Sequence, residues 1–231
     1  MTKLAAPAPV QTIADLLKRL GDIPPERVRA RPYPGTATEQ DVIDIEAREG
    51  RLCELVDGVL VEKTVGYYEA RLATILGYFL EHFLGEHDLG IVLGADGTLR
   101  LMPGLVRIPD VCFTSWRKFP QRELPAEPIP DLVPDLAVEV LSEGNTEAEM
   151  RRKLGEYFRA GVRLVWLIDP ATRTARVHRS PTKKATVPAD GTLVGGPVLP
   201  GFSLPLTTLF ARAGKQARRE QKLRQKNNGK K

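Results

Sequence analysis

Hydrophobic positions in the first third of the chain alternate between helix-like and strand-like spacing. In residues 11–20 and again in residues 68–84, aliphatic and aromatic side chains recur on one helical face. Residues 52–63 instead contain two short runs of strand-forming residues on either side of Asp57-Gly58, a dipeptide typical of tight hairpin turns. The pattern therefore predicts a helix, a β-hairpin and a longer helix, in that order.

The middle of the chain predicts two buried strands joined by a helix. Residues 136–141 and 162–168 are almost wholly apolar, as in strands covered on both faces. Between them, Thr146 can cap a helix that ends near Gly161. A strand, a helix and a strand at this spacing form a crossover, which places the two strands side by side in a parallel or mixed sheet.

Further strands are predicted before and after this crossover. One is expected to run without a break through residues 106–113, and residues 175–179 and 193–206 favour edge strands. Five prolines make residues 117–134 a predicted loop. The whole pattern indicates an α/β or α+β fold, with a mixed sheet flanked by helices.

Glu139 is the most informative polar position, because it interrupts an apolar strand between Val138 and Val140. A lone carboxylate is costly to bury unless it is paired or neutralised. A basic partner, a protonated carboxyl group or a metal ion would each remove that cost. All three remain open from the sequence alone.

Two other acids have similar surroundings. Asp110 precedes an apolar run, and Glu54 is flanked by Leu52 and Leu55 in the first strand of the hairpin. Carboxylates that converge on one pocket raise each other's pKa unless a cation lies between them. Oxygen ligands without histidine or cysteine favour Mg²⁺ or Mn²⁺.

Lys153 is placed to join these acids. On the predicted helix it lies at the rim of the buried stripe, from which its side chain can reach Glu139. The simpler interpretations are a structural ion pair between Glu139 and Lys153, a strand-entry cap at Asp110 and an exposed position for Glu54.

Composition and charge narrow the class of protein. The chain has 231 residues, 42% hydrophobic and 27% charged, with no apolar stretch of the roughly 18 residues that a membrane span needs and no secretory signal at its start. Only two cysteines occur, so a disulfide framework is excluded and a cytoplasmic location is expected.

The net charge is +5 and is unevenly distributed along the chain. Residues 212–231 hold nine Lys or Arg and one Glu, a net charge of +8, which leaves −3 on residues 1–211. This basic tail could bind nucleic-acid phosphates or could be a solvated chain end.

A series of short motifs, in this order along the chain, resembles the Uma-type family of proposed restriction endonucleases, within the PD-(D/E)XK nuclease superfamily. The motifs are Glu54-Leu-Val-Asp-Gly58, Pro109-Asp110, Ala137-Val-Glu-Val-Leu-Ser142, Lys153-Leu-Gly-Glu-Tyr157, Val165-Trp-Leu-Ile-Asp-Pro170 and Leu199-Pro-Gly-Phe202. The resemblance implies a restriction-endonuclease-like fold over residues 36–211. Residues 1–35 would form an N-terminal helix and proline-rich linker, and residues 212–231 a disordered basic tail.

The resemblance also implies the site residues. Asp110 and Glu139 match the signature acids of the superfamily, with Glu54 upstream. The lysine expected two residues after Glu139 is replaced by Leu141, and Lys153 matches the place to which that lysine moves in the family. Glu69 stands in the region where the family often has a histidine, and would supply an extra oxygen ligand.

The activity implied is metal-dependent hydrolysis of DNA by an enzyme that can form a homodimer. Asp110 and Glu139, with the Val140 carbonyl, would hold Mg²⁺ or Mn²⁺, and Glu54 would bind a second metal or support the first. Lys153 would orient the attacking water or stabilise charge on the phosphate. The alternatives are a catalytically silent nuclease-fold protein that binds nucleic acid or a protein partner, and a small-molecule hydrolase.

Overall fold

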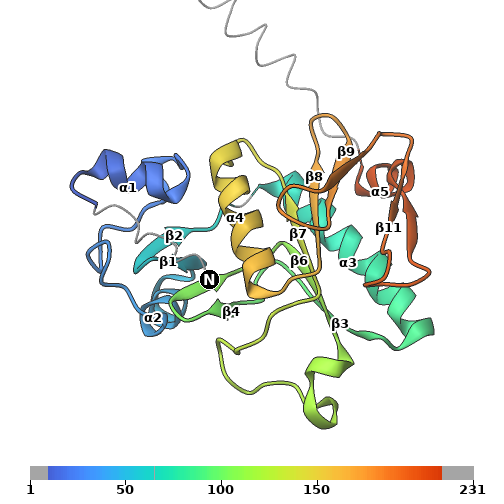
Figure 1. The fold of residues 1–231 in the computed structure, drawn as a ribbon, viewed down its shortest axis with the longest axis horizontal. Coiled ribbons are helices and arrows are strands. Elements are labelled where there is room, and N and C mark those ends of the chain that lie inside the picture. The colour runs from blue at the N-terminus through green and yellow to red at the C-terminus, as the bar shows by residue number, and fades with distance from the viewer. Residues whose placement is uncertain (1–9, 65, 215–231) are drawn as a thin grey trace, which may run out of the picture.

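The computed structural model describes residues 10–64 and 66–214, and within these ranges the strands form three sheets (Figure 1). The largest sheet has the order β10-β9-β8-β7-β6-β3, a second has the order β2-β1-β5-β4, and β11 pairs with β12. The strands are β1 (Cys53–Val56), β2 (Val59–Glu62), β3 (Gly90–Leu93), β4 (Leu99–Met102), β5 (Leu105–Arg107), β6 (Val111–Ser115), β7 (Leu136–Val140), β8 (Leu164–Asp169), β9 (Thr174–His178), β10 (Lys184–Val187), β11 (Thr192–Val194) and β12 (Ser203–Pro205). The α-helices are α1 (Ile13–Leu20), α2 (Glu39–Glu49), α3 (Tyr67–His87), α4 (Glu147–Ala160) and α5 (Leu206–Ala213), and short 3-10 turns are η1 (Pro25–Arg27), η2 (Trp116–Lys118) and η3 (Pro120–Arg122).

The large sheet is covered by helices on both faces, which confirms the predicted mixed α/β fold. β7 and β8 are parallel and are joined by α4, as the crossover pattern predicts. Val138 and Trp166 face the core shared with α3 and α5, whereas Ala137 and Val165 face the core shared with α4. Because side chains alternate along a strand, Glu139 lies on the α4 face. The acid is therefore directed at the helix that carries the predicted lysine.

The hairpin turn also forms as predicted. β1 pairs with β2 around Asp57 and Gly58, whose φ angles of 51° and 72° lie in the left-handed region. Successive positive φ values suit the twist of a two-residue hairpin turn, and this explains the Asp-Gly sequence. The hairpin joins β5 and β4 in the smaller sheet, against which α2 packs.

The prediction of one continuous strand through residues 106–113 is wrong. The chain leaves the small sheet at the end of β5 and enters the large sheet at β6, so Asp110 lies in the connection between them. Pro109 has no N–H to donate to a ladder, and the N–H of Asp110 donates to Val138 O in the neighbouring sheet at 3.0 Å. The break places Asp110 beside β7.

The described part of the chain begins at residue 10 and ends at residue 214. The predicted basic tail begins at residue 212, but α5 continues to Ala213, and residues 215–231 lie outside the described residues, as do residues 1–9. Within the described ranges, no helix is both long and apolar enough to cross a bilayer.

The first described helix packs on the crossover helix. A capping box between Thr12 and Asp15 starts α1, and Gly21 ends it with a φ of 96°. Leu16 and Leu20 share a hydrophobic core with Met150 and other residues of α4. Figure 1 shows α1 beside α4, on the side of the small sheet.

Gly21→Ala should destabilise the protein more than Gly161→Ala. Both glycines have positive φ, so either alanine adds about 1 kcal/mol of backbone strain. A Cβ at Gly21 would lie 2.6 Å from the backbone N and Cα of Glu149, whereas a Cβ at Gly161 meets nothing within 4 Å. Overpacking should add about 1–3 kcal/mol at Gly21 alone. Urea denaturation of the two variants measures the difference, and equal losses would contradict the close packing of α1 on α4.

Candidate active site

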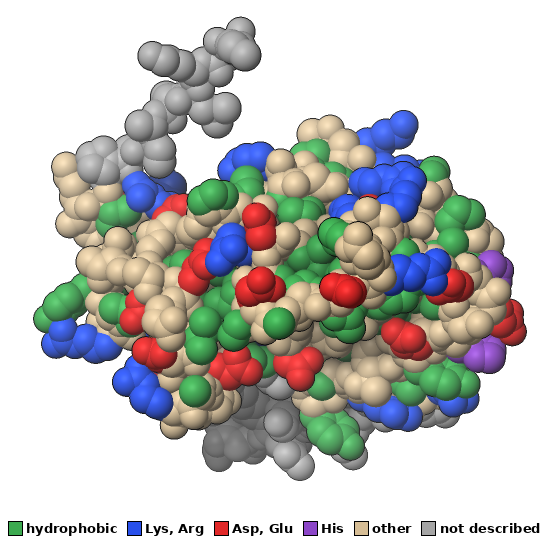
Figure 2. Space-filling view, turned by 90° about the horizontal axis from the view of Figure 1, so that it is seen from below, with side chains coloured by type: hydrophobic (Ala, Val, Ile, Leu, Met, Phe, Trp, Pro, Cys, Tyr) green, Lys and Arg blue, Asp and Glu red, His purple; other side chains and the backbone are tan. Residues whose placement is uncertain are grey.

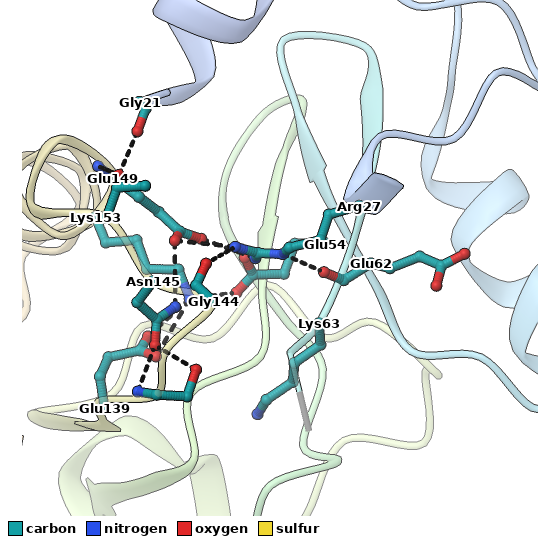
Figure 3. Close-up of polar contacts among 12 residues, drawn as sticks. Gly21, Arg27, Glu54, Glu62, Lys63, Glu139, Gly144, Asn145, Glu149 and Lys153 are labelled. Atoms are coloured by element: carbon teal, nitrogen blue, oxygen red, sulfur yellow. Dashed lines mark hydrogen bonds and ion pairs between the residues drawn. The ribbon is translucent and has the colours of Figure 1, made fainter. Parts of the chain in front are cut away.

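Three of the predicted residues meet between the two sheets, under helix α4. Glu54 comes from β1, Glu139 from β7 and Lys153 from α4 (Figure 3). The Lys153 ammonium lies 3.1 Å from Glu54 Oε1, and 3.1 and 3.2 Å from the two carboxylate oxygens of Glu139. All three side chains are buried, with Lys153 only 5% exposed. The lysine therefore joins two sheets through one charged centre.

A second buried cation, Arg107, continues this network. Its Nη1 donates to Glu54 Oε2 at 2.6 Å, and its guanidinium also binds Glu156 of α4. Glu156 in turn accepts a hydrogen bond from Arg152 at 2.7 Å. Sequence reasoning missed Arg107, although a charged residue inside the apolar run 105–108 is the same signal that pointed to Glu139.

Tyr157 adds a neutral donor to Glu139. The side chain is fully buried, as expected for a core residue, and its hydroxyl donates to Glu139 Oε1. Tyr157 lies four residues after Lys153, so both face the sheet from one side of α4. Two side chains on the same face of α4, Lys153 and Tyr157, therefore both hydrogen-bond to the Glu139 carboxylate.

The surroundings shift the pKa values of Glu54 and Glu139 in opposite directions. Burial by itself would raise the pKa of Glu54, but the nearby Lys153 and Arg107 outweigh it and hold that pKa well below its usual range. Burial raises the pKa of Glu139 above its ordinary value, and the negative charges of Asp110 and Glu54 add to this effect while Lys153 opposes it. For Lys153, burial would lower the pKa, yet the two glutamates raise it, so the ammonium stays protonated at neutral pH.

Asp110 lies at the end of β7, next to the residue that follows Glu139. The N–H of Val140 donates to Asp110 Oδ2 at 2.7 Å, and Lys63 Nζ lies 3.0 Å from Asp110 Oδ1. Lys63 also donates to the carbonyls of Ala95 and Ile108 at 2.8 and 2.7 Å. The strand break described above is what brings this carboxylate to the end of the neighbouring strand.

The donor set around Asp110 and Glu139 fits a hard divalent cation. Both side chains supply carboxylate oxygens, and Val140, the residue directly after Glu139, adds a main-chain carbonyl. The negative charge of Asp110 raises the pKa of Glu139, and a divalent cation would remove that conflict. The Asp110 side chain is 16% exposed against 6% for Glu139, so the Asp110 side is the more accessible to solvent.

The structure does not bring the other two predicted ligands to the same position. Glu54 already accepts hydrogen bonds from Arg107, Lys153 and the N–H of Ile108. Glu69 lies in the first turn of α3 with its carboxylate folded back over Gly66, where an added Cβ would be 2.1 Å from Oε2. In residues 10–64 and 66–214, no three Asp, Glu, His or Cys side chains form a group that could hold a metal ion. The candidate ligands are therefore two carboxylates and one carbonyl.

The two cysteines are poor nucleophiles. Both Cys53 and Cys112 are buried, and burial raises the pKa of their thiols to about 11 and about 12. Each thiol is thus protonated at neutral pH, so neither cysteine is a candidate nucleophile.

Comparison with known proteins agrees with this fold. The model of a family described as "Uma2: Putative restriction endonuclease" matches residues 40–207. The chain belongs to the Uma2 family. This confirms the resemblance noted in the sequence, and residues 40–207 contain every member of the candidate site.

A solved structure gives independent support for the fold. A protein from Anabaena variabilis, titled "a putative nuclease belonging to DUF820", is similar with a TM-score of 0.62 and 16% sequence identity, over 70% of this chain and 91% of that chain. At this identity the likeness shows the Uma2 chain's fold and not its activity. No curated protein matches the chain.

Arg107→Met should destabilise the Uma2 protein strongly, whereas Arg151→Met should not. Removing Arg107 leaves Glu54 and Glu156 buried without their shared cation, which typically costs about 3–5 kcal/mol. Arg151 is 72% exposed on α4 and pairs only with the exposed Glu147, so its loss should leave stability unchanged. Urea unfolding at pH 7 measures both, and a loss of less than about 1 kcal/mol for Arg107→Met would contradict the network.

Proposed function

We propose that this Uma2-family protein is a DNA endonuclease that depends on a divalent metal ion. Asp110, Glu139 and the Val140 carbonyl would hold Mg²⁺ or Mn²⁺. The observation that supports the proposal is the hydrogen bond that the Val140 N–H donates to the Asp110 carboxylate, which brings Asp110 to the end of β7, the strand that carries Glu139. A site of oxygen donors at the end of a central strand suits a hard cation.

The metal would lower the pKa of a bound water and neutralise charge on the phosphate. Lys153 would act as a hydrogen-bond donor and as a fixed positive charge, because its raised pKa keeps the ammonium protonated at neutral pH. Its ammonium would orient the scissile phosphate or the attacking water. Glu54 is assigned to holding Lys153 and Arg107, since its side chain pairs with these two buried cations and is only 1% exposed.

DNA is the substrate class that the family description favours, and charge suggests where it would be bound. Figure 2 shows one face on which acidic side chains form a band across the middle and Lys and Arg lie mainly towards the margins. Such a face repels a phosphate backbone. Residues 215–231, in contrast, contain eight Lys or Arg and one Glu, so we assign the general attraction for DNA to them. A homodimer and a cytoplasmic location remain predictions from the sequence.

Purified protein should nick or linearise plasmid DNA in Mg²⁺ or Mn²⁺, and Asp110→Asn and Glu139→Gln should each abolish cleavage. Loss of either carboxylate removes half of the charged metal ligands. Mn²⁺ should also raise the Tm of the wild type through linkage, and this shift should disappear in Glu139→Gln. Gel electrophoresis and thermal denaturation with and without metal provide the two measurements.

Glu147→Gln is the matched control, because Glu147 lies on the exposed side of the same helix as Lys153. It should retain both cleavage and the Mn²⁺ shift. A wild type that binds DNA but cleaves none in either metal would support the alternative, a catalytically silent nuclease-fold protein.

Removal of residues 215–231 should weaken DNA binding and reduce its dependence on salt. For duplex DNA, the slope of log K against log salt becomes shallower by about 0.9 for each phosphate that the protein no longer binds. Fluorescence anisotropy between low and physiological salt measures the slope for the full chain and for a chain ending at Gly214. An unchanged slope would show that the basic residues of the tail do not contact phosphates.

A further inference from the structure

A buried ion pair that joins a residue before the family-matched region to α4 lies one helical turn from Lys153. Arg27 belongs to η1, before the matched residues 40–207, and its guanidinium binds Glu149 of α4 through two parallel hydrogen bonds of 2.8 and 3.0 Å. Both side chains are at least nine-tenths buried. A bidentate, buried pair of this kind is among the stronger ionic contacts in proteins.

Arg27 also ties together three segments around the candidate site. Its Nε donates to the carbonyl of Glu62 at the end of β2, and its Nη1 donates to the carbonyl of Gly144 in the loop after β7 (Figure 3). Glu149 further accepts from Asn145, whose own side-chain oxygen accepts from the N–H and the hydroxyl of Ser142. The chain of contacts thus runs from Arg27 to the residues that leave β7.

Glu149, the acid of the pair with Arg27, also lies close to Lys153 on α4. Glu149 and Lys153 are four residues apart on α4, the spacing at which an acid and a lysine pair directly. Burial by itself would raise the pKa of Glu149. The hydrogen bonds from Arg27 and the charge of Lys153 together outweigh burial and hold that pKa below its usual range. Besides Arg27, Lys153 is the cation whose charge lowers the pKa of this buried carboxylate.

We infer that Arg27 is a positioning residue: by neutralising Glu149 it keeps the Lys153 ammonium on Glu54 and Glu139 and away from its helical neighbour. The inference rests on the proposed nuclease function for its kinetic consequences, but the geometry it concerns can be observed without activity. It makes residues 13–28, which precede the family-matched region, part of what sets up the site.

The test is a double-mutant cycle on plasmid cleavage in Mg²⁺. Arg27→Ala should lower kcat by about 10- to 100-fold, the effect of misplacing a reacting group by about 1 Å. KM should not change, because the Arg27 side chain is buried and bonded within the protein. Arg27→Ala combined with Glu149→Gln should recover most of kcat, because the competing carboxylate is gone. If Arg27 were merely structural, the double variant would be no more active than the single one, and that result would overturn the inference.

Arg27→Lys separates charge from shape. It keeps the positive charge beside Glu149 but loses the forked contacts to the carbonyls of Glu62 and Gly144, so kcat should stay near that of the wild type while the Tm falls. A kcat as low as that of Arg27→Ala would show that the fork, and not neutralisation of Glu149, is what matters.

Arg100→Ala is the matched control. Arg100 also makes a two-point contact with its acid, Glu39, between β4 and α2, although this pair is only part-buried. Its loss should lower the Tm and leave kcat unchanged.

A structural measurement separates failure of this inference from failure of the proposed function. In a crystal structure of Arg27→Ala, Lys153 Nζ should lie within hydrogen-bond distance of Glu149, and in the double variant it should return to Glu139. Lys153 remaining on Glu54 and Glu139 in Arg27→Ala would overturn the inference whether or not the wild type cleaves DNA.

Discussion

The structure depends on a positive charge buried between two carboxylates that come from different sheets. Lys153 is almost fully buried and holds Glu54 of the small sheet and Glu139 of the large sheet in one centre. Neither acid could be buried alone without a large desolvation cost, and neither could the lysine. The relative placement of β1, β7 and α4 is therefore set by charge pairing as well as by the hydrophobic cores on either side.

The sequence indicated this centre through one charged residue, Glu139, in an otherwise apolar strand. Glu139 was predictable because its strand is otherwise apolar, and Lys153 because helical geometry puts it within reach of that strand. The same reasoning applies to Arg107, a charged residue in an apolar run, but its partners lie 53 and 49 residues away along the chain and no local spacing indicates them. Pairing between distant segments is decided by tertiary structure, which a periodic pattern does not contain.

The position of Asp110 shows a different limit. The apolar residues on either side of Pro109-Asp110 favour strand on both sides, and periodicity alone joins them into one strand. The proline breaks the ladder and sends the two halves into separate sheets. The family resemblance pairs Asp110 with Glu139, and the structure places Asp110 beside β7, whereas the local pattern gave the wrong strand. For Glu69, the resemblance indicated a region of the chain, but the side chain turns back over the start of its own helix.

The number of acidic and basic side chains around the candidate site suggests how it can be buried and still attract a phosphate group. Around the two candidate carboxylate ligands, four acids with mostly buried side chains (Glu54, Asp110, Glu139 and Glu156) are matched by four cations (Lys63, Arg107, Arg152 and Lys153), of which Arg152 also pairs with the exposed Asp57. This set is neutral, which makes its burial tolerable. A divalent cation beside Asp110 would leave it with two positive charges, the sign that attracts a phosphodiester. Affinity for phosphate would then be coupled to metal binding. In the neutral state the cations are engaged by the cluster's own acids and offer little attraction to an anion.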